Sequence, residues 1–464
     1  MVGEQVVEMQ LNIFSDIVLS WSGYSSPVYS IEELKTWIAD IKNKTKVNIK
    51  KSNIDDSDNW YYSEDEGVIR NEKNSFFQIS GIRSKLVDKI VEQPIILQNE
   101  IGYLGIICKI INGTLHFLMQ AKIEPGNINY VQISPTIQAT KSNFTKQHGG
   151  SAPRYLDYFV NAKKYSILYD QIQSEQSSRF LSKRNRNIII LVNEDVKESP
   201  YHRWMTLHQI KQFMKVPNLV NMDTRTVLSG IPIDAEIEST VNRFSDKALY
   251  KSMLSDGGSD IVDLFYYLNN YKMFNDTPRK LIPLYDLKNW KYNNNNEFEC
   301  SDLSSFKLIH CDIEIEGREV IKWDQPLIES NGKALFGLFT CVENGVRLFL
   351  IKTKPEIGAF DGIEFGPSVQ REFVTDEIED KIYRLFIDKL RNKKGIMVNN
   401  VFSEEGGRFY HEENNNAIIE IEKDEIGELP ENYFWVTYKT LNELIQYNNI
   451  LNVQLRNLLS TLEI

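Results

Sequence analysis

Apolar and polar residues follow two different periods along this chain, and the same order of periods occurs twice. Ser30 and Glu33 have the spacing of a capping box, and apolar residues at helical spacing, beginning with Leu34 and Trp37, follow them. A second helix with a similar pattern is expected to begin near Asp260. Each copy of the pattern therefore opens with a helix.

Strand-like sequence follows the first helix. Residues 101–111 and 114–122 are apolar or alternating runs, and the Asn112-Gly113 pair between them is a strong hairpin signal. Residues 343–345 repeat this turn in the second copy, and another short strand over 130–134 ends at Pro135. Each copy is thus expected to contain a sheet built largely from hairpins.

Helices are expected after these strands. The pattern predicts helices over 154–174 and 376–392, a strand over 187–192, and a closing helix over 206–214. Strands grouped first, with helices at the edges, favour an α+β fold over a doubly wound parallel sheet.

The repetition is visible residue by residue. Residues 93–140 align without a gap with residues 325–372, at a constant offset of 232 (325 − 93). Because the repeat is domain-sized rather than solenoid-sized, it predicts two homologous halves, 1–235 and 236–464, packed around a pseudo-twofold axis. Identical pairs include Gly126 with Gly358, Lys122 with Lys354, Glu124 with Glu356, Gln138 with Gln370, Ser174-Glu175 with Ser403-Glu404, Arg179-Phe180 with Arg408-Phe409, Asn221 with Asn452, and Arg225 with Arg456.

Composition narrows the class of protein. The hydrophobic share of 42% and the charged share of 25% are ordinary for a globular protein. A net charge of −11 argues against nucleic acid as a partner, but not against a nucleotide-sized anion. Three of the four cysteines lie in apolar runs and are expected to be buried thiols, and we expect a cytoplasmic protein without a membrane span.

The densest polar cluster lies in the first copy. Alternate residues of the strand over 114–122 and its continuation would place four polar side chains on one face. This face could line a cleft, or it could be a solvated outer surface. The cluster comprises His116, Gln120, Lys122, Glu124, Thr136, Gln138, Thr140, Asn143 and His148.

The second copy favours the cleft. It keeps the equivalents of Lys122 and Glu124 but places Leu348 where the first copy has His116. An apolar replacement is not expected on a merely solvated face. The first copy is therefore the candidate working site, and the second a structural or vestigial one.

A basic segment follows. Lys183, Arg184 and Arg186 place three cations within four residues, which could neutralise a diphosphate or could form a solvated turn. The second copy has Glu412-Glu413 in the corresponding segment, so the charge is inverted there. Further along, Asp223 and Arg225 could form a buried pair or could orient a ligand.

Several chemistries lack their motifs. The chain has no phosphate-binding P-loop, no GxGxxG after a strand, no HExxH, no Cys/His ligand set and no Gly-x-Ser-x-Gly elbow. We therefore expect neither a metal nor a redox cofactor.

These segments together resemble the NDP-hexose 2,3-dehydratases of deoxysugar biosynthesis. The resemblance spans most of the chain, including its duplication. The matching stretches are His116 to Gly126, Ser134 to Thr140, Asn143, His148-Gly149-Gly150 with Tyr155 and Phe159, Gln173-Ser174-Glu175-Gln176, Lys183 to Asn187, and Asn221 to Ser229.

The resemblance implies a fold and a reaction. The fold would be two tandem Nudix-like halves, each a mixed sheet flanked by helices, assembled as a homodimer without the Nudix hydrolase signature. The substrate would be an NDP-4-keto-6-deoxyhexose, most often the dTDP-glucose derivative. The enzyme would remove the carbon 3 proton and the carbon 2 hydroxyl to give a 3,4-diketo-2,6-dideoxyhexose, which a downstream ketoreductase or aminotransferase would then use.

Roles for individual residues are hypotheses. Glu124 or His148 would act as base or acid, and His116 with Lys122 would stabilise the enolate or donate a proton. The sugar and the nucleotide base would contact Gln120, Thr136, Gln138, Thr140 and Asn143. The diphosphate would contact Arg154, Lys183, Arg184 and Arg186, and the wider substrate site would include Tyr155, Gln173, Glu175, Asp223 and Arg225.

Two other functions fit the same residues. A non-catalytic nucleotide-sugar binding protein would be stabilised by the ligand without changing it. An isomerase or epimerase would use the same enolate but retain the carbon 2 hydroxyl.

Overall fold

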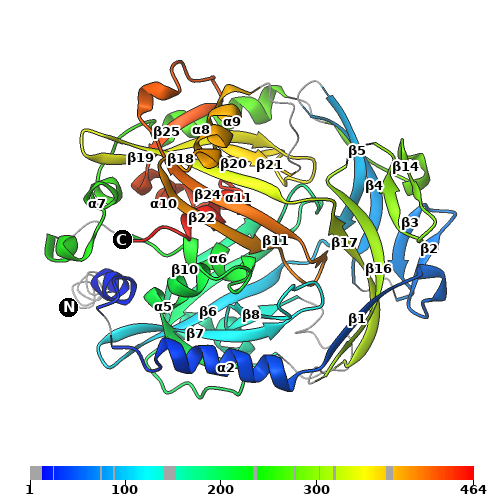
Figure 1. The fold of residues 1–464 in the computed structure, drawn as a ribbon, viewed down its shortest axis with the longest axis horizontal. Coiled ribbons are helices and arrows are strands. Elements are labelled where there is room, and N and C mark those ends of the chain that lie inside the picture. The colour runs from blue at the N-terminus through cyan, green and yellow to red at the C-terminus, as the bar shows by residue number, and fades with distance from the viewer. Residues whose placement is uncertain are drawn as a thin grey trace.

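The chain builds a smaller sheet and a larger mixed sheet in each copy, with helices on their faces (Figure 1). We describe residues 13–24, 26–73, 76–86, 89–140, 153–233, 238–275, 278–302, 304–316, 320–372 and 380–464 of a computed structural model. The mixed sheets, the flanking helices and the repetition agree with the architecture predicted from the sequence.

The first copy begins with helical residues 13–21 and helix α2 (Ile31–Lys44). Its further elements are β1 (Val47–Ser52), β2 (Trp60–Ser63), β3 (Val68–Asn71), β4 (Gln78–Leu86), β5 (Lys89–Leu97), β6 (Gly102–Ile111), β7 (Thr114–Ile123), β8 (Val131–Ser134), β9 (Ile137–Ala139), α4 (Leu156–Val160), β10 (Ser166–Ser174), β11 (Arg184–Leu191), β12 (His202–Thr206), α5 (Leu207–Met214) and α6 (Met222–Ser229).

The second copy repeats this order. Its elements are α7 (Lys247–Leu254), α8 (Ile261–Phe274), β13 (Arg279–Ile282), β14 (Trp290–Tyr292), β15 (Phe298–Cys300), β16 (Phe306–Ile315), β17 (Lys322–Ser330), β18 (Ala334–Glu343), β19 (Val346–Pro355), β20 (Ile363–Pro367), β21 (Val369–Arg371), α9 (Lys381–Arg391), β22 (Ile396–Ser403), β23 (Phe409–Tyr410), β24 (Glu413–Glu420), β25 (Tyr433–Thr437), α10 (Tyr438–Leu444) and α11 (Val453–Leu459).

Local sequence signals account for the turns and the helix starts. Asn112 and Gly113 have φ values of 51° and 73°, and Asn344 and Gly345 have 52° and 78°. Positive φ at both central residues is what a type I′ hairpin turn requires. Ser30 and Glu33 form the predicted capping box at the start of α2.

The two copies exchange strands. β1 of the first copy pairs antiparallel with β16 of the second, and β13 of the second copy pairs antiparallel with β4 of the first. Figure 1 shows β1 running beside β16 at the edge of the molecule. Such reciprocal pairing relates the copies by a pseudo-twofold axis and ties them into one body.

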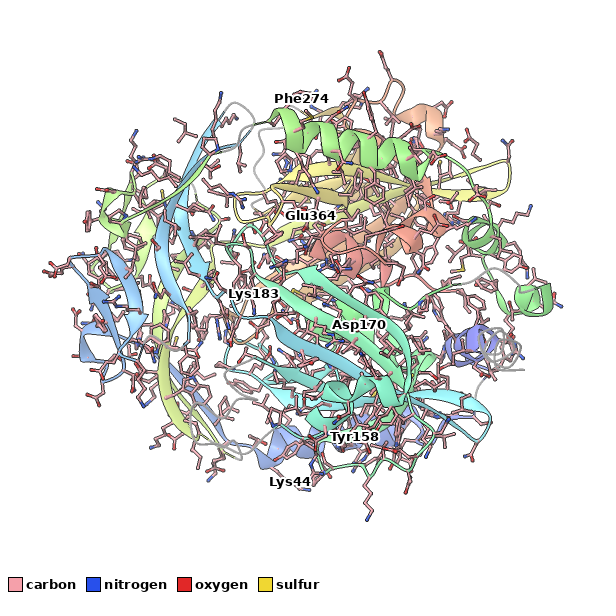
Figure 2. All side chains as sticks on the ribbon, turned by 180° about the vertical axis from the view of Figure 1, so that it is seen from behind. Lys44, Tyr158, Asp170, Lys183, Phe274 and Glu364 are labelled. Carbon is pink, nitrogen blue, oxygen red and sulfur yellow. The ribbon has the colours of Figure 1, made fainter. Side chains whose placement is uncertain are left out.

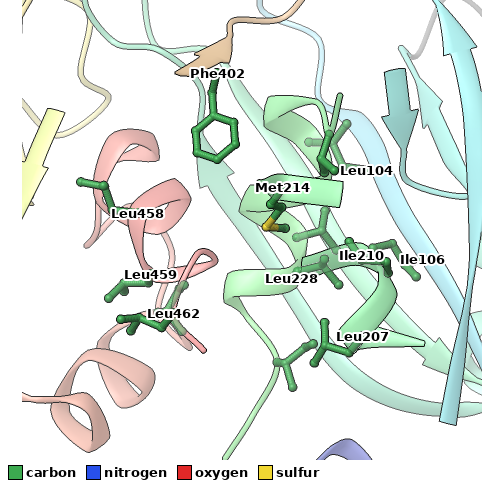
Figure 3. Close-up of a cluster of buried hydrophobic side chains, with 14 of the residues drawn as sticks. Leu104, Ile106, Leu207, Ile210, Met214, Leu228, Phe402, Leu458, Leu459 and Leu462 are labelled. Atoms are coloured by element: carbon green, nitrogen blue, oxygen red, sulfur yellow. The ribbon is translucent and has the colours of Figure 1, made fainter. Parts of the chain in front are cut away.

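A shared hydrophobic core lies where the two larger sheets face each other. Leu207, Ile210 and Leu228 from α5 and α6 belong to the same buried cluster as Leu458 and Leu459 from α11. Figure 3 shows these side chains on opposite sides of that interface, with Phe402 above them. Helix α6 therefore has its position set by both copies.

One expected helix is largely a strand. Only residues 156–160 of the predicted helix over 154–174 are α-helical, and β10 occupies residues 166–174. This segment pairs antiparallel with β11 along its length, from Ser166–Leu191 to Ser174–Arg184. Pairing with a neighbouring strand outweighs the local helical spacing. The corresponding prediction in the second copy agrees better, since α9 covers 381–391.

Other expectations from the sequence have mixed outcomes. Cys108, Cys311 and Cys341 are buried free thiols, as predicted, and Cys300 is a half-buried one. No helix in the part of the chain described above is both long and apolar enough to cross a membrane. The predicted boundary between the halves at residue 235 falls in 234–237, outside the described residues.

Candidate functional site

A chain of polar contacts begins at the end of β7. The ammonium of Lys122 lies 2.8 Å from Glu124 Oε1, and both side chains project from the same face of the strand. Gln138 on β9 donates to the same carboxylate oxygen at 3.2 Å, and Asn221 donates to Gln138 at 3.2 Å. Three separate elements thus position one carboxylate and one ammonium group.

Further acids surround this chain of contacts. Asp223 lies in the first turn of α6, whose N-cap is Asn221, and Glu175 follows the end of β10. Asn185 donates to Glu175 Oε2 at 2.6 Å. Burial, together with the charges of neighbouring carboxylates, raises the pKa of both Asp223 and Glu175. Both groups therefore bind protons more tightly than exposed acids do.

The second copy contributes two residues that the sequence analysis missed, Glu405 and Arg408. Gly126 N donates to Gly406 O at 2.7 Å, and His411 N donates to Gly126 O at 2.8 Å. A Cβ atom at Gly126 would lie 1.6 Å from Phe409 O, so only glycine allows this close approach. The loop before β23 is thereby held against the turn that follows Glu124.

We call this assembly the copy-one network. Lys122, Glu405 and Arg408 keep some solvent-accessible surface, with 15% of the Lys122 side chain exposed. The members are Lys122, Glu124, Gln138, Glu175, Lys183, Asn221 and Asp223 of the first copy and Glu405 and Arg408 of the second.

The second copy builds a counterpart, the copy-two network. Gln370 donates to Glu356 Oε1 at 2.9 Å, and Asn452 donates to Gln370 at 2.8 Å, which repeats the first chain of contacts. The loop of the first copy crosses over in return, since Gly358 N donates to Ser177 O at 2.8 Å. The members are Lys354, Glu356, Gln370, Glu404, Glu412, Asn452 and Gln454 of the second copy and Gln176 and Arg179 of the first.

The two networks differ in their charged groups. Where the copy-one network has Glu405 and Asp223, the copy-two network has the amides Gln176 and Gln454. Glu412 occupies the position of Lys183, and Glu372 that of Thr140. In the second network Glu372 lies 3.4 Å from Arg179, so its arginine is already held by a carboxylate.

The structure separates His116 from this site. It lies eight residues before Glu124 along the strand, which corresponds to about 26 Å. Its Nδ1 contacts Thr114 O at 2.8 Å, and its Nε2 accepts from Val28 N at 3.2 Å. Burial lowers the pKa of His116, so a neutral ring held by the backbone fits its surroundings. This geometry speaks against the predicted catalytic role.

The three cations expected to bind a diphosphate do not lie together. Lys183 immediately precedes β11, which begins at Arg184, and successive side chains of a strand point to opposite faces. Lys183 is buried and donates to Glu100 O at 2.5 Å. Figure 2 shows it near the centre of the molecule.

The other two cations are engaged elsewhere. Arg186 forms two hydrogen bonds with Asp170, of 2.6 and 2.5 Å, and Arg184 stacks on the Phe360 ring at 3.7 Å. Only Lys183 belongs to the copy-one network, which corrects the predicted three-cation cradle.

Several other predicted contacts hold the fold together. Ile107 N donates to the Thr136 hydroxyl, and Thr136 donates to Leu118 O, while Ser368 makes the same pair of contacts in the second copy. Gln173 donates to Ile445 O at 2.8 Å. Arg225 donates to Val220 O and Ser403 O and does not pair with Asp223. The polar atoms of these residues are engaged by the chain itself, and their contacts with a substrate stay predictions.

The remaining predicted residues are Gln120, Thr140, Arg154, Tyr155, Asn143 and His148. Gln120 lies two residues before Lys122, on the same face of β7, and accepts from Ser134 at 3.3 Å, and Thr140 follows β9. Tyr155 donates to Lys197 O at 2.8 Å, next to the exposed Arg154. Asn143 and His148 fall in residues 141–152, which the description leaves out.

The copy-one network combines groups for acid–base chemistry. Glu124 beside an ammonium group is a carboxylate that can accept a proton, while acids of raised pKa nearby can donate one. Lys122 can stabilise negative charge on an oxygen. Such an arrangement suits a reaction that removes a proton from one atom of a substrate and donates a proton to another.

Comparison with known proteins agrees with this chemistry. The family model for NDP-hexose 2,3-dehydratase matches residues 31–231 and again residues 262–462. The chain therefore belongs to the NDP-hexose 2,3-dehydratase family, and both copies carry the family pattern.

Three curated relatives extend the comparison over nearly the whole chain. Each is named dTDP-4-dehydro-6-deoxy-alpha-D-glucopyranose 2,3-dehydratase. The protein from Streptomyces violaceoruber is 34% identical over 91% of this chain and 95% of its own. Those from Saccharopolyspora spinosa and Amycolatopsis orientalis are 33% and 32% identical, over 93% and 92% of this chain and 90% and 89% of their own.

Proposed function

We propose that the protein is a 2,3-dehydratase acting on an NDP-4-keto-6-deoxyhexose, with dTDP-4-keto-6-deoxy-D-glucose as its substrate. The observation that carries the proposal is the Lys122–Glu124 pair at 2.8 Å, held by Gln138 within a set of buried acids. The printed names of the three relatives supply the substrate class.

The reaction needs few groups. The ketone at carbon 4 acidifies the proton at carbon 3, so a positioned carboxylate can remove it. We assign this step to Glu124, and we assign Lys122 to the carbon 4 oxygen, where negative charge develops. Loss of the carbon 2 hydroxyl as water then gives an enol, which becomes the 3,4-diketo-2,6-dideoxyhexose. The elimination involves no net oxidation, so its chemistry requires no redox cofactor.

Binding roles follow from position. Gln120 lies on the face of β7 that carries Lys122, and Gln138 on β9 donates to Glu124. With Thr140, which follows β9, they would contact the sugar or the base. Lys183 and Arg154 remain the candidates for the diphosphate, and Asn143 and His148 remain predictions from the sequence.

The proposal is tested by incubation with dTDP-4-keto-6-deoxy-D-glucose, with and without a chelator, followed by mass analysis. The expected product has lost one water whether or not the chelator is present. A nicotinamide-dependent ketoreductase added to the mixture should trap the unstable diketone. A product of unchanged mass with an altered sugar would favour an isomerase, and an unchanged sugar that stabilises the protein would favour a binding protein.

Three further parts of the proposal rest on the family resemblance. Each half would have a Nudix-like topology, the chain would form a homodimer, and the enzyme would work in the cytoplasm before a ketoreductase or aminotransferase. Sedimentation of the purified chain tests the homodimer, since a single species at the monomer mass would contradict it.

A further inference from the structure

The loop formed by residues 404–408 crosses from the second copy to the end of β7 in the first. Two backbone hydrogen bonds hold it there, Gly126 N to Gly406 O at 2.7 Å and His411 N to Gly126 O at 2.8 Å. Glu405 immediately precedes Gly406, and Glu124 lies two residues before Gly126. The paired backbones therefore bring these two carboxyl groups close together, near the ammonium of Lys122.

The orientation of Glu405 is set by its own loop. Gly407 N donates to Glu405 Oε1 at 2.8 Å, which leaves Oε2 to carry a transferable proton. A Cβ atom at position 407 would lie 2.4 Å from the same Oε1, so the carboxyl group can adopt this position only beside a glycine. Glu405 also keeps part of its surface accessible to solvent.

We propose that Glu405, supplied by the second copy, is the catalytic acid that protonates the departing carbon 2 hydroxyl in the site of the first copy. This inference rests on the proposed 2,3-dehydratase function and extends it, because it makes one active site from both halves of the chain. The second copy is then a required part of the catalytic centre as well as a structural partner.

The proton movements balance. Glu124 takes the proton from carbon 3, and the electrons of that C–H bond form an enolate whose negative charge lies on the carbon 4 oxygen. The carbon 4 carbonyl then forms again, and the enolate electrons form the carbon 2–carbon 3 double bond as the carbon 2–oxygen bond breaks. Glu405 gives its proton to the departing oxygen, so that water leaves. The enol then becomes the ketone when protonated Glu124 returns its proton to carbon 2 and ionised Glu405 takes the proton of the carbon 3 hydroxyl. Both carboxyl groups end in their starting forms, and the net change is the loss of one water.

The electrostatic surroundings suit an acid. Burial raises the pKa of Glu405, and the negative charge of Glu124 raises it further, while Arg408 and Lys122 act in the opposite direction. When two carboxyl groups lie close together and one of them is paired with a lysine, the paired group is the more readily ionised and the other the more readily protonated. Glu124, which has the lysine, is the natural base, and Glu405 the natural acid.

The second copy provides an internal comparison. Position 405 corresponds to Gln176, and Gly406-Gly407 correspond to Ser177-Ser178. The copy-two network therefore keeps the Lys354–Glu356 pair but has an amide where an acid would be needed. An amide cannot protonate a leaving hydroxyl, so the copy-two network lacks the acid proposed for the first, besides its differences at the positions of Asp223, Lys183 and Thr140.

The test is the Glu405→Gln variant of the full chain, which installs the residue found at the equivalent position. Removal of a general acid is expected to lower kcat by about 10²- to 10⁴-fold, with substrate affinity within about threefold of the wild type, because shape is conserved. In D₂O, the variant should still exchange the carbon 3 hydrogen of recovered substrate for deuterium, since Glu124 remains.

Three results would overturn the assignment. A Glu405→Gln variant with the wild-type kcat shows that another group is the acid. A folded variant that binds substrate but loses both exchange and dehydration shows that Glu405 serves the base step instead. A wild-type protein that removes no water from the substrate overturns the proposed function and this inference together, whereas the first two results leave the proposed function standing.

A matched control is available within the chain. Glu356→Gln makes the same carboxyl-to-amide change at the copy-two equivalent of Glu124 and should leave dehydration and exchange unchanged. Circular dichroism and thermal unfolding of both variants establish that they fold.

Discussion

The copy-one and copy-two networks share the same arrangement of backbone and hydrogen bonds but differ in their ionisable side chains. Both place a glutamate within electrostatic reach of a lysine and anchor it with a glutamine from the following short strand. Both hold that glutamine with the asparagine that caps the last helix of the copy. Both receive a loop from the other copy. The chemistry differs because two acids of the first network are amides in the second. The comparison teaches that the fold preserves positions, whereas the ionisable groups at those positions decide whether they can catalyse.

The arginine supplied by each crossing loop shows the same distinction. Arg179 stacks on Phe306 at 4.3 Å and lies 3.4 Å from Glu372, and Arg408 stacks on Phe77 at 4.2 Å but has Thr140 in place of that glutamate. Arg408 instead donates to Gly407 O at 2.8 Å and to Gln98 at 3.3 Å. The charge of Arg408 is balanced by other acids, among them Glu405, Glu100 and Glu124, so the two arginines interact with different carboxylates.

The largest expected difference between the networks is in catalysis. Glu124→Gln should lower kcat by about 10³-fold, because it removes the base that we propose for the carbon 3 proton. The kcat of Glu356→Gln should stay within about twofold of the wild-type value, because Glu356 lies outside the proposed active site. Initial rates of water loss for the two purified variants measure both. Equal losses in the two variants would break the comparison, since they would make the second network catalytic too.

The next effect is on stability. Burial raises the pKa of Glu356 to about 7, with Lys354 acting in the opposite direction and the charges of Glu372 and Glu364 adding to the rise. The folded protein thus holds a proton that the unfolded chain releases above about pH 4.5, so this stabilisation is complete below that pH and is lost as the pH rises to about 7. Relative to the wild type, Glu356→Gln should gain about 2–3 kcal/mol in free energy of unfolding between pH 5 and pH 8. Urea unfolding at both pH values measures the difference, and a constant difference would contradict the raised pKa.

A smaller effect is expected in the pH dependence of turnover. Burial and the charge of Glu124 raise the pKa of Glu405 to about 7, and an acid must be protonated to act. The wild-type kcat should therefore fall about tenfold for each pH unit well above 7. The residual kcat of Glu405→Gln should lack this decline.

Several other charged groups interact with Glu405 and are alternative sources of the decline in kcat. Besides Glu124, the charged groups that interact with Glu405 are Lys122 from β7, Arg408 from its own loop, Asp223 from α6, Glu175 from the end of β10 and Lys183 at the start of β11. An identical decline in Glu405→Gln would assign the titration to one of these groups.

The smallest effect concerns the arginine. Thr140→Glu copies the residue of the second network and should pair with Arg408, as Glu372 pairs with Arg179. An ion pair of about 1 kcal/mol would raise KM about fivefold. Thr140→Gln has similar bulk without the charge and should raise KM less. If the two variants have the same KM, the charge at this position is unimportant.

Local patterns in the sequence predicted the elements that depend on neighbouring residues. The Asn112-Gly113 and Asn344-Gly345 turns and the capping box at Ser30 are present, because dihedral preferences and caps act within a few residues. The prediction over 154–174 was wrong for β10, where a partner more than ten residues away in the chain decided the conformation.

The same division holds for the site. Alternation along β7 was enough to place Lys122 and Glu124 on one face, and the retained pairs in the second copy marked them as part of a common framework. Alternation also implied that His116 shared that face, but the length of the strand put it at the far end. Position along an element decides proximity as much as the face does.

The sequence by itself determined the duplication, the family and the paired lysine and glutamate, because these are recorded in residue identity and short-range periodicity. Only the tertiary structure decided that Glu405 and Arg408 join a site nearly 300 residues away from them in the chain (405 − 124 = 281). That meeting depends on two loops crossing between the copies at Gly126 and Gly358, a contact made by backbone atoms of either half. No local pattern encodes such a contact, since it exists only when both copies are folded and packed together.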